Sequence, residues 1–275
     1  MDTRNLPASD AQWLTAVRRQ LRFYRKTWRF VGLLIFVLII SVAGTAISIA
    51  YDSAGSSAGD YLYSLTSSVP VFGIIVCAFI GGDAIAMDFG SGTGYFMLVL
   101  PVRRIVLLLG RYAAAFLASL ALLLVFYAFG LFGDVWFYGI AAVPWAAFVG
   151  SIGLAALFAL ATLSTAFFLS AFFRSPAISM VVTILVLFLG FDILDGVLAV
   201  TAVEPWFSLL YAGSAVALPF EGQAHETVTH LPGRRGLTIH TWFPYVWEGT
   251  AIMVAYFVAF LVISAVLYQY KESKG

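Results

Sequence analysis

Long apolar runs alternate with short polar segments along almost the whole chain. Crossing the hydrocarbon core of a bilayer takes about 20 apolar residues in a helix, because each backbone polar group needs an internal partner there. Six runs meet this requirement, at about residues 30–50, 66–86, 105–130, 141–172, 177–199 and 247–269. We therefore expect an all-α polytopic membrane protein whose six transmembrane helices form one domain of residues 30–275.

Two of the six runs are irregular. The second is interrupted by Pro70, Gly81, Gly82 and Asp83, and the fourth is longer than one crossing needs. We expect the boundaries of the second run to be the least accurate. The fourth run either begins as an interfacial turn at Pro144 or extends beyond the bilayer at its far end, and small residues within it favour close helix packing.

Composition agrees with a membrane location. Hydrophobic residues make up 62% of the chain and charged residues only 11%, whereas a soluble domain carries about 25% charged residues to cover its surface. The single cysteine, Cys77, excludes an intramolecular disulfide and a cysteine metal cluster. It is expected to be a small buried hydrophobe.

Basic residues fall almost entirely on one side of this arrangement. Of the 15 lysines and arginines, only Arg234 and Arg235 belong to the opposite side. Lysine and arginine are enriched in the cytoplasmic segments of membrane proteins. An even number of spans with both termini in the cytoplasm places the strongly basic segments on the cytoplasmic side. Five or seven spans would put a basic terminus outside. We predict a multi-pass protein of the cell membrane with cytoplasmic N- and C-termini.

The first apolar run also permits a second interpretation, a cleaved signal peptide. Ser48-Ile49-Ala50 resembles a small-x-small cleavage site. The apolar core of a signal peptide usually has about 7–15 residues and follows a short basic segment, and this run exceeds both limits. We favour a retained membrane anchor.

Residues 10–29 have the period of an amphipathic helix. One face carries Trp13, Val17, Leu21, Tyr24 and Trp28, and arginines fill much of the remainder. Ser9 and Gln12 fit a capping box that starts the helix. Such a helix is typical of the cytoplasmic headgroup layer, in contact with membrane lipid.

The segment of residues 1–29 has two possible roles. It is either a positive anchor with no further role or a cytoplasmic elbow helix that links an attached motor to the first span. In the second case Trp13, Arg18, Arg22 and Trp28 form its interface.

The segment between the second and third runs combines unusual features. Residues 84–104 contain an acidic residue, a glycine run, a short apolar helical turn, a proline and two arginines. An apolar turn in a cytosolic loop favours docking into a groove on another protein. The glycines lack the lysine and hydroxyl of a phosphate-binding loop, so no nucleotide site is expected here.

With these residues the chain resembles the permease subunits of type-2, exporter-like ABC transporters. In that family a coupling segment carries an acidic residue, Gly-Thr, an apolar pair, Pro-Val-x-Arg, and Gly-Lys at the start of span three. The matching residues are Asp88, Gly92-Thr93, Leu98-Val99-Leu100, Pro101-Val102-Arg103-Arg104 and Gly110-Arg111. A Ser-x-x-x-Arg-Ser turn between spans four and five is matched by Ser170, Arg174 and Ser175.

Two positions depart from the family pattern. Glutamate is usual where Asp83 or Asp88 stands, and either aspartate can be the counterpart; lysine is usual where Arg111 stands. The resemblance covers nearly the whole chain, and the coupling segment is its most specific part.

The resemblance implies a permease that forms a substrate pathway, in the direction of export. It implies two ABC ATPase subunits per complex, a second permease copy or a homologue, and ATP and Mg²⁺ bound by the ATPases. It implies no enzyme activity, cofactor, metal or nucleic acid for this chain. The implied ATPase contacts are Asp88, Gly92, Thr93, Tyr95, Phe96, Pro101, Arg103 and Arg104.

Other functions remain open to different degrees. A secondary carrier or a non-transporting scaffold is the main alternative, although neither midplane charges nor paired repeats are evident. An intramembrane protease lacks its motifs: Leu189-Gly190-Phe191-Asp192 is not Gly-x-Gly-Asp, no predicted span contains histidine, and His-Glu-x-x-His is absent.

Ionisable residues near the span ends are candidates for function, because charge is costly in hydrocarbon. Asp83 and Arg111 lie near cytoplasmic ends and can pair. Asp192, Asp195 and Glu248 lie near outer ends, where they either line a pathway or simply face water.

The long external region, residues 200–246, holds all three histidines of the chain. His225, His230 and His240 accompany Glu221 and Glu226, but their spacing matches no defined metal pattern, so no metal site is predicted. Residues 205–220 are apolar but too short to cross, which predicts a re-entrant or interfacial helix.

Overall fold

A computed structural model describes residues 9–50, 57–87, 104–173, 175–220, 225–230 and 238–273. Within these ranges, six helical segments are long and apolar enough to cross a membrane. They are Trp28–Ser48, Ala58–Gly81, Ile105–Tyr138, Trp145–Ser170, Pro176–Thr201 and Val246–Tyr270. These six helices agree with the prediction of a polytopic α-helical membrane protein with six spans.

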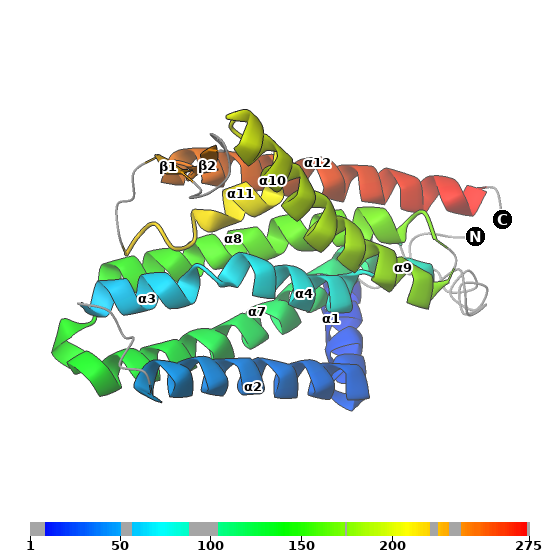
Figure 1. The fold of residues 1–275 in the computed structure, drawn as a ribbon. Coiled ribbons are helices and arrows are strands. Elements are labelled where there is room, and N and C mark those ends of the chain that lie inside the picture. Colours follow the sequence, from blue (N-terminus) through cyan, green and yellow to red (C-terminus); the bar gives the residue numbers. More distant parts are fainter. Residues whose placement is uncertain are drawn as a thin grey trace.

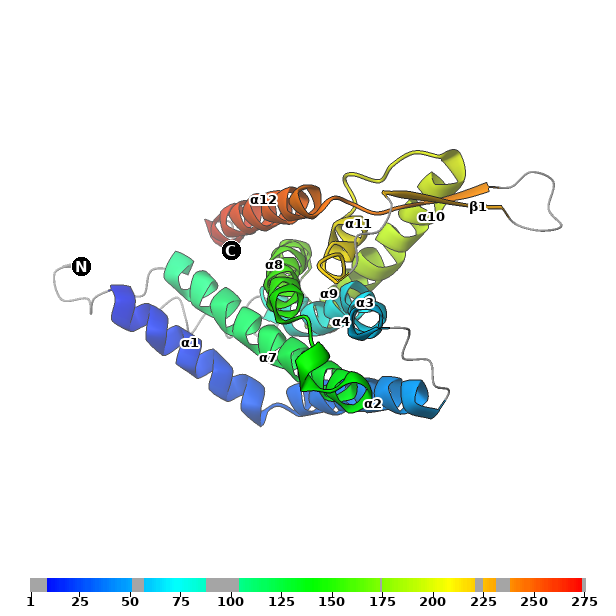
Figure 2. The ribbon, with the colours of Figure 1, turned by 90° about the vertical axis from the view of Figure 1, so that its left-hand side faces the viewer.

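Helix α8 (Trp145–Ser170) lies at the centre of the bundle (Figures 1 and 2). It packs against α4 (Val69–Gly81), α7 (Arg104–Tyr138) and α12 (Val246–Ser273). The small residues of this span permit close approach, as expected, since Ala155, Ala159 and Ala161 are all fully buried.

The second span differs most from its predicted bounds. It consists of α3 (Ala58–Thr66) and α4, separated at Ser67 and Ser68. Pro70 stands in the first turn of α4, where its missing N–H costs no helical hydrogen bond. Residues 58–65, which we expected in an external loop, are therefore helical, and the span ends at Gly81 rather than at residue 86.

The third span is longer than predicted. Helix α7 continues to Tyr138, so most of the expected external loop at 131–140 is helical. Gly139 ends it with a φ of 83°, a conformation that glycine adopts without strain. A 3₁₀ turn, Ile140–Ala142, precedes α8, and Pro144 is the residue that caps the start of α8. Of the two alternatives for the fourth span, the turn before α8 is present, and its position at the membrane interface stays a prediction.

The fifth span is continuous but not uniform. It contains α9 (Pro176–Ile184), a π-helical segment (Leu185–Gly190) and α10 (Phe191–Thr201). Ala202 follows in a left-handed conformation and ends the span. Large apolar side chains on α10 and α12 remain exposed, among them Ile193, Val258 and Val266. Lipid is the expected cover for such faces.

The region predicted to be external, residues 200–246, contains structure that we did not predict. Strands β1 (Glu226–His230) and β2 (Thr238–Trp242) form an antiparallel hairpin that pairs Glu226 with Trp242. The fold is thus not purely helical. Within the segment predicted as a re-entrant or interfacial helix lies a short helix, α11 (Leu209–Ser214), which packs on α4, α8 and α12.

Helix α1 (Ser9–Lys26) runs crosswise to α2 (Trp28–Ala50) and packs against α7 (Figures 1 and 2). The two helices approach closely at Gly110, where an added Cβ would lie 2.8 Å from Cβ of Ala16. Helix α1 includes Ser9, which the sequence predicts as the capping residue before a helix at 10–29. The side chains of Ser9 and Gln12, which form the predicted capping box, lie outside the described ones.

The predicted apolar face of α1 is present only in part. Val17 is buried and Tyr24 is half-buried, but Trp13 is 41% exposed. Trp28 does not belong to this face, because α1 ends before Thr27 and Trp28 begins α2, where it is 86% exposed. The helical phase that places Val17 and Tyr24 against the bundle ends before Trp28.

Candidate functional site

The end of α4 leads directly into the segment that the sequence singles out, residues 84–104. We call residues 80–86, which form the end of this helix and the turn after it, the junction turn. All of these residues are buried. The junction turn overlaps the start of the predicted coupling segment, residues 84–104.

Glycines allow the junction turn to sit tightly against its neighbours. A Cβ on Gly81 would lie 3.0 Å from Leu163 of α8. A Cβ on Gly82 would overlap the carbonyl oxygen of Ala78 and approach Met180 of α9 to 3.2 Å. These two positions therefore require glycine for close packing as well as for ending the helix.

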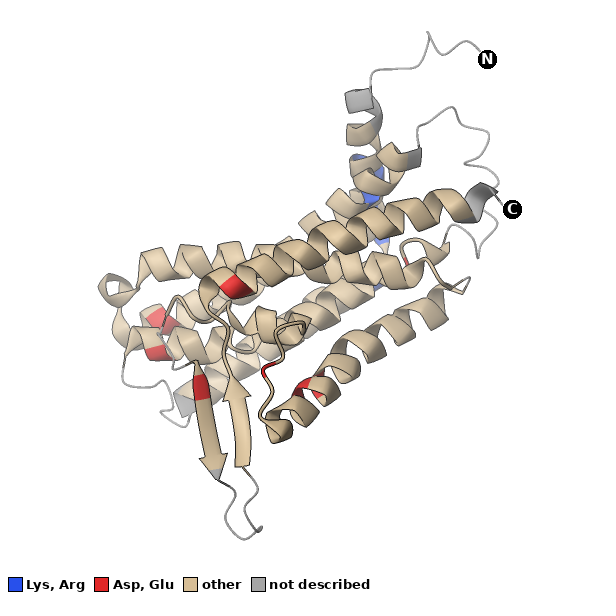
Figure 3. Ribbon diagram, turned by 90° about the horizontal axis from the view of Figure 1, so that it is seen from above, with Lys and Arg blue, Asp and Glu red and all other residues tan. Residues whose placement is uncertain are grey.

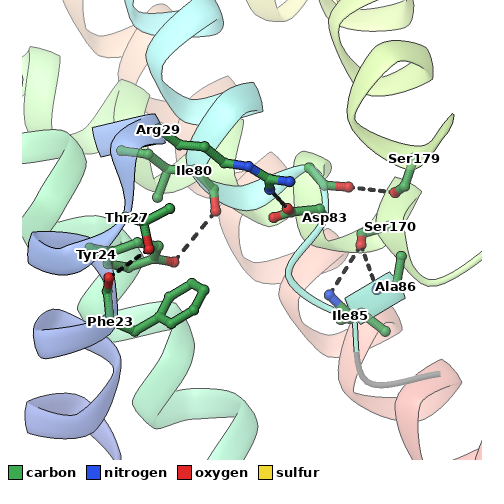
Figure 4. A network of polar contacts seen from close by, with 11 residues as sticks. Phe23, Tyr24, Thr27, Arg29, Ile80, Asp83, Ile85, Ala86, Ser170 and Ser179 are labelled. Carbon is green, nitrogen blue, oxygen red and sulfur yellow. Dashed lines mark hydrogen bonds and ion pairs between the residues drawn. The ribbon is translucent and has the colours of Figure 1, made fainter. Parts of the chain in front are cut away.

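An ion pair ties the junction turn to the first span. Arg29, in the first turn of α2, pairs through Nη1 with Oδ2 of Asp83 (Figure 4). The Asp83 side chain is only 8% exposed, whereas that of Arg29 is 53% exposed. Burial raises the pKa of the Asp83 carboxyl, and the nearby Arg29 guanidinium offsets part of that rise. The sequence indicated Arg111 as a residue that can pair with Asp83; the structure adds an ion pair from Arg29, which the sequence did not indicate.

Two serines hold the junction turn from the other side. Ser170, the last residue of α8, accepts hydrogen bonds through Oγ from the backbone N–H groups of Ile85 and Ala86 at 3.1 and 3.0 Å. Ser179 of α9 donates to the carbonyl oxygen of Gly82 (Figure 4). Backbone N–H and carbonyl groups after the end of a helix lack helical hydrogen-bond partners. The two serine hydroxyls supply such partners here.

Two further side chains complete the contacts. The hydroxyl of Tyr24 in α1 donates to the carbonyl oxygen of Ile80 at 3.4 Å, and burial raises the pKa of Tyr24 to about 12. Nη1 of Arg111 in α7 donates to the carbonyl oxygen of Ala84 at 3.3 Å. Side chains from α1, α2, α7, α8 and α9 therefore all contact one short turn.

Charge is distributed unevenly along the bundle (Figure 3). Among the described side chains, the basic residues lie on α1 and at the starts of α2 and α7, beside the junction turn. The acidic residues other than Asp83 lie on segments at the opposite end. They are Asp60, Asp134, Asp192, Asp195, Glu204, Glu226 and Glu248. The described side chains thus give the bundle one basic end and one acidic end.

Most of the predicted coupling residues cannot be placed on this framework. Asp88, Gly92, Thr93, Tyr95, Phe96, Pro101 and Arg103 lie outside the described residues, as does Arg174. Arg104 is the first residue of α7, and its side chain is not described. Of the predicted elbow interface, Arg18 and Arg22 are exposed on α1.

No protein-family model matches the chain, and a search among curated proteins finds no match. The functional argument therefore depends on the residues and contacts of the chain itself.

The three acidic residues predicted for a pathway occupy different environments. Asp195 accepts a hydrogen bond from Ser208 Oγ at 2.9 Å, and Asp192 is exposed. Glu248 accepts one from the backbone N–H of Tyr245 at 3.3 Å and so caps the start of α12. Among the described residues, no hydrogen bond or ion pair joins either aspartate to Glu248.

The external histidines have partners that the sequence did not indicate. His240 pairs with Glu226 across the hairpin. Nε2 of His225 lies 3.4 Å from Oε1 of Glu204, a residue that follows α10. Glu221 lies outside the described residues. Glu204, His225 and Glu248 come together although they are far apart in sequence, so no local pattern identifies them.

Asp134 is a second site that sequence reasoning missed. We expected residues 131–140 to form a loop and therefore did not single out Asp134. It lies in α7 and is fully buried. Neither carboxylate oxygen has a hydrogen-bond partner among the described residues. A buried polar group without a partner lowers the stability of a fold. Asp134 therefore either serves a function or simply destabilises the protein.

Proposed function

We propose that the chain is the transmembrane permease subunit of an ATP-driven ABC transporter of the type-2 class, acting in export. It resides in the cell membrane with both termini in the cytoplasm. Two copies, or one copy and a homologue, form the substrate pathway, and each docks a separate ATPase through residues 84–104. ATP and Mg²⁺ bind to the ATPases, and this chain carries no catalytic residue.

The junction turn is the observation that carries the proposal. The predicted docking segment begins at this turn, and the turn contacts α1, α2, α7, α8 and α9 through Tyr24, Arg29, Arg111, Ser170 and Ser179. A push on the docking segment by a closing ATPase would reach these helices at once. Packed helices move as rigid bodies, so such a push can rock spans between inward-facing and outward-facing states.

The basic end of the bundle supports the proposed orientation. Basic residues of α1, α2 and α7 lie beside the junction turn, and this end is expected to face the cytoplasm. ATP and the ATPases are in the cytoplasm, so the docking segment and its motor would be on the same side of the membrane. The arginines of α1 remain exposed and available to lipid headgroups or to the ATPase.

Copurification tests the proposal. The chain, carrying a non-disruptive affinity tag, is solubilised from native membranes in a mild detergent, and copurifying proteins are identified by mass spectrometry. We expect an ATP-binding subunit in an amount equal to that of the permease. Recovery of a stable complex without any ATPase would contradict the proposal.

Charge reversal then tests the docking role. The double variant Arg103→Glu/Arg104→Glu is expected to lose the ATPase on purification, whereas Arg234→Glu/Arg235→Glu is expected to retain it. The second pair is also a double arginine but belongs to the predicted external side. Equal retention by both variants would reject residues 84–104 as the docking segment.

A further inference from the structure

Three side chains capable of binding a metal meet at the acidic end of the bundle. Glu204 follows α10, His225 precedes the hairpin strand β1, and Glu248 lies in the first turn of α12. One ligand atom from each residue lies within 4.8 Å of the other two. All three side chains are half-buried, so a cation can reach them and still be partly withdrawn from water.

The tautomer of His225 is set by its surroundings. Nδ1 lies 2.6 Å from the carbonyl oxygen of Phe243. Because a carbonyl oxygen can only accept, Nδ1 carries the proton, and Nε2 of the neutral ring presents a lone pair. The ring of Tyr245 stacks on the imidazole with a centroid separation of 4.7 Å, which further restrains its orientation.

The lone pair of His225 faces a carboxylate. Nε2 lies 3.4 Å from Oε1 of Glu204. Two acceptors at this distance repel unless a proton or a cation lies between them. In a tetrahedral site with metal–ligand bonds of about 2.0 Å, two ligand atoms are about 3.3 Å apart. The observed separation of 3.4 Å is close to one edge of such a site, and the other two separations lie within 4.8 Å.

Both glutamates are oriented by a second set of hydrogen bonds. The hydroxyl of Tyr211 donates to Oε1 of Glu204, the same oxygen that faces His225. The backbone N–H of Tyr245 donates to Oε2 of Glu248 at 3.3 Å. Metal ligands in proteins are commonly held in this way, with the non-ligating nitrogen of histidine bonded to a carbonyl oxygen.

We infer that Glu204, His225 and Glu248 bind one divalent transition-metal cation of the Zn²⁺ type, with water at the remaining position. Nitrogen and carboxylate oxygen are ligands that Zn²⁺ accepts at such distances. The bound cation joins three separate segments, namely the one after α10, the base of the hairpin and the start of α12. It thereby links residues 200–246 to α12, the sixth span. This inference does not depend on the proposed transport function.

Zinc titration of purified protein tests the site. The protein is purified with a tag that contains no histidine, stripped with a chelator and exchanged into chelator-free buffer. Binding of Zn²⁺ is followed by competition with a zinc-sensitive dye and by thermal unfolding. We expect one Zn²⁺ per chain and a rise in Tm on addition of Zn²⁺.

Variants separate this site from other external groups. Glu248→Gln keeps an oxygen to accept from Tyr245 N–H but removes the carboxylate, and His225→Ala removes the nitrogen ligand. Each is expected to lower the Zn²⁺ affinity at least tenfold, whereas the control His240→Ala, in the same hairpin, is expected to leave the affinity unchanged.

Two results would overturn the assignment. If the wild-type protein binds no Zn²⁺, Glu204, His225 and Glu248 do not form a metal site. If His240→Ala loses Zn²⁺ and Glu248→Gln retains it, the metal is bound by the hairpin alone. Because Glu248→Gln preserves the helix cap, it gives a valid result even if His225→Ala fails to fold.

Discussion

Arg29 of α2 forms an ion pair with Asp83, 54 residues further along the chain, and so joins the first span to the junction turn. The pair is asymmetric, because Asp83 is buried and Arg29 is half exposed. In the proposed transporter this contact couples the α1–α2 unit to the motion of the docking segment.

Removal of Arg29 should destabilise the protein through Asp83. Arg29→Ala leaves a buried carboxylate without its partner, and exposure of Arg29 limits the cost to about 1–2 kcal/mol. In the background of Asp83→Asn the same substitution should cost much less. A double-mutant cycle on the free energy of unfolding measures this difference. Equal effects of Arg29→Ala in both backgrounds would show that the pair contributes nothing.

Ser170 should matter more than an exposed serine. Ser170→Ala leaves the N–H groups of Ile85 and Ala86 without their acceptor, at a cost of about 1–3 kcal/mol. Faster hydrogen exchange at residues 82–87 should accompany the loss. The control Ser48→Ala removes only a bond from Oγ to the carbonyl oxygen of Gly44 within α2 and should have little effect. Unchanged exchange in Ser170→Ala would argue against the anchoring role of Ser170.

Gly110 should be the critical glycine between α1 and α7. In Gly110→Ala the new Cβ meets Ala16 at 2.8 Å, so α1 must shift or detach. Gly32→Ala meets nothing within 4 Å and should stabilise its helix by about 0.5–1 kcal/mol. Proteolysis within α1 measures detachment. If both variants are cleaved at the rate of wild type, α1 does not depend on this contact.

Asp134 should be replaceable with a gain in stability. Asp134→Asn removes a buried carboxylate that has no hydrogen-bond partner among the described residues and should raise the free energy of unfolding by about 1–3 kcal/mol. The exposed Asp192, changed to Asn, serves as the control and should have little effect. Thermal unfolding in detergent measures both. A loss of stability in Asp134→Asn would instead indicate that this carboxylate has a partner in the assembled protein.

Six spans could be predicted because length and hydropathy alone decide which segments can cross a bilayer. The boundaries depended on more local effects. Pro70 starts a new helix rather than interrupting one, and the apolar residues around Asp134 continue α7 where a loop was expected. Helix α1 could be predicted from its hydrophobic period. Because this helix ends before Thr27, Trp28 does not lie on its apolar face.

The contacts at both ends of the bundle could not be predicted from local pattern. The sequence indicated Arg111 as a residue that can pair with Asp83, and only the crossing of α1 and α2 over the bundle end brings Arg29 to this carboxylate. Glu204, His225 and Glu248 carry no shared motif, since the hairpin and α12 bring them together. Short strands rich in threonine and histidine gave too weak a signal to predict the hairpin.

The central claim is that residues 84–104 meet an ATPase in the cytoplasm. Cross-linking from Phe96→Cys tests it in native membranes, with Thr227→Cys on the exposed hairpin as the control; the native Cys77 is fully buried. The account predicts a covalent adduct between Phe96→Cys and an ATP-binding subunit, and none from Thr227→Cys. An adduct from Thr227→Cys alone, or modification of Phe96→Cys by a membrane-impermeant reagent in intact cells, would contradict it.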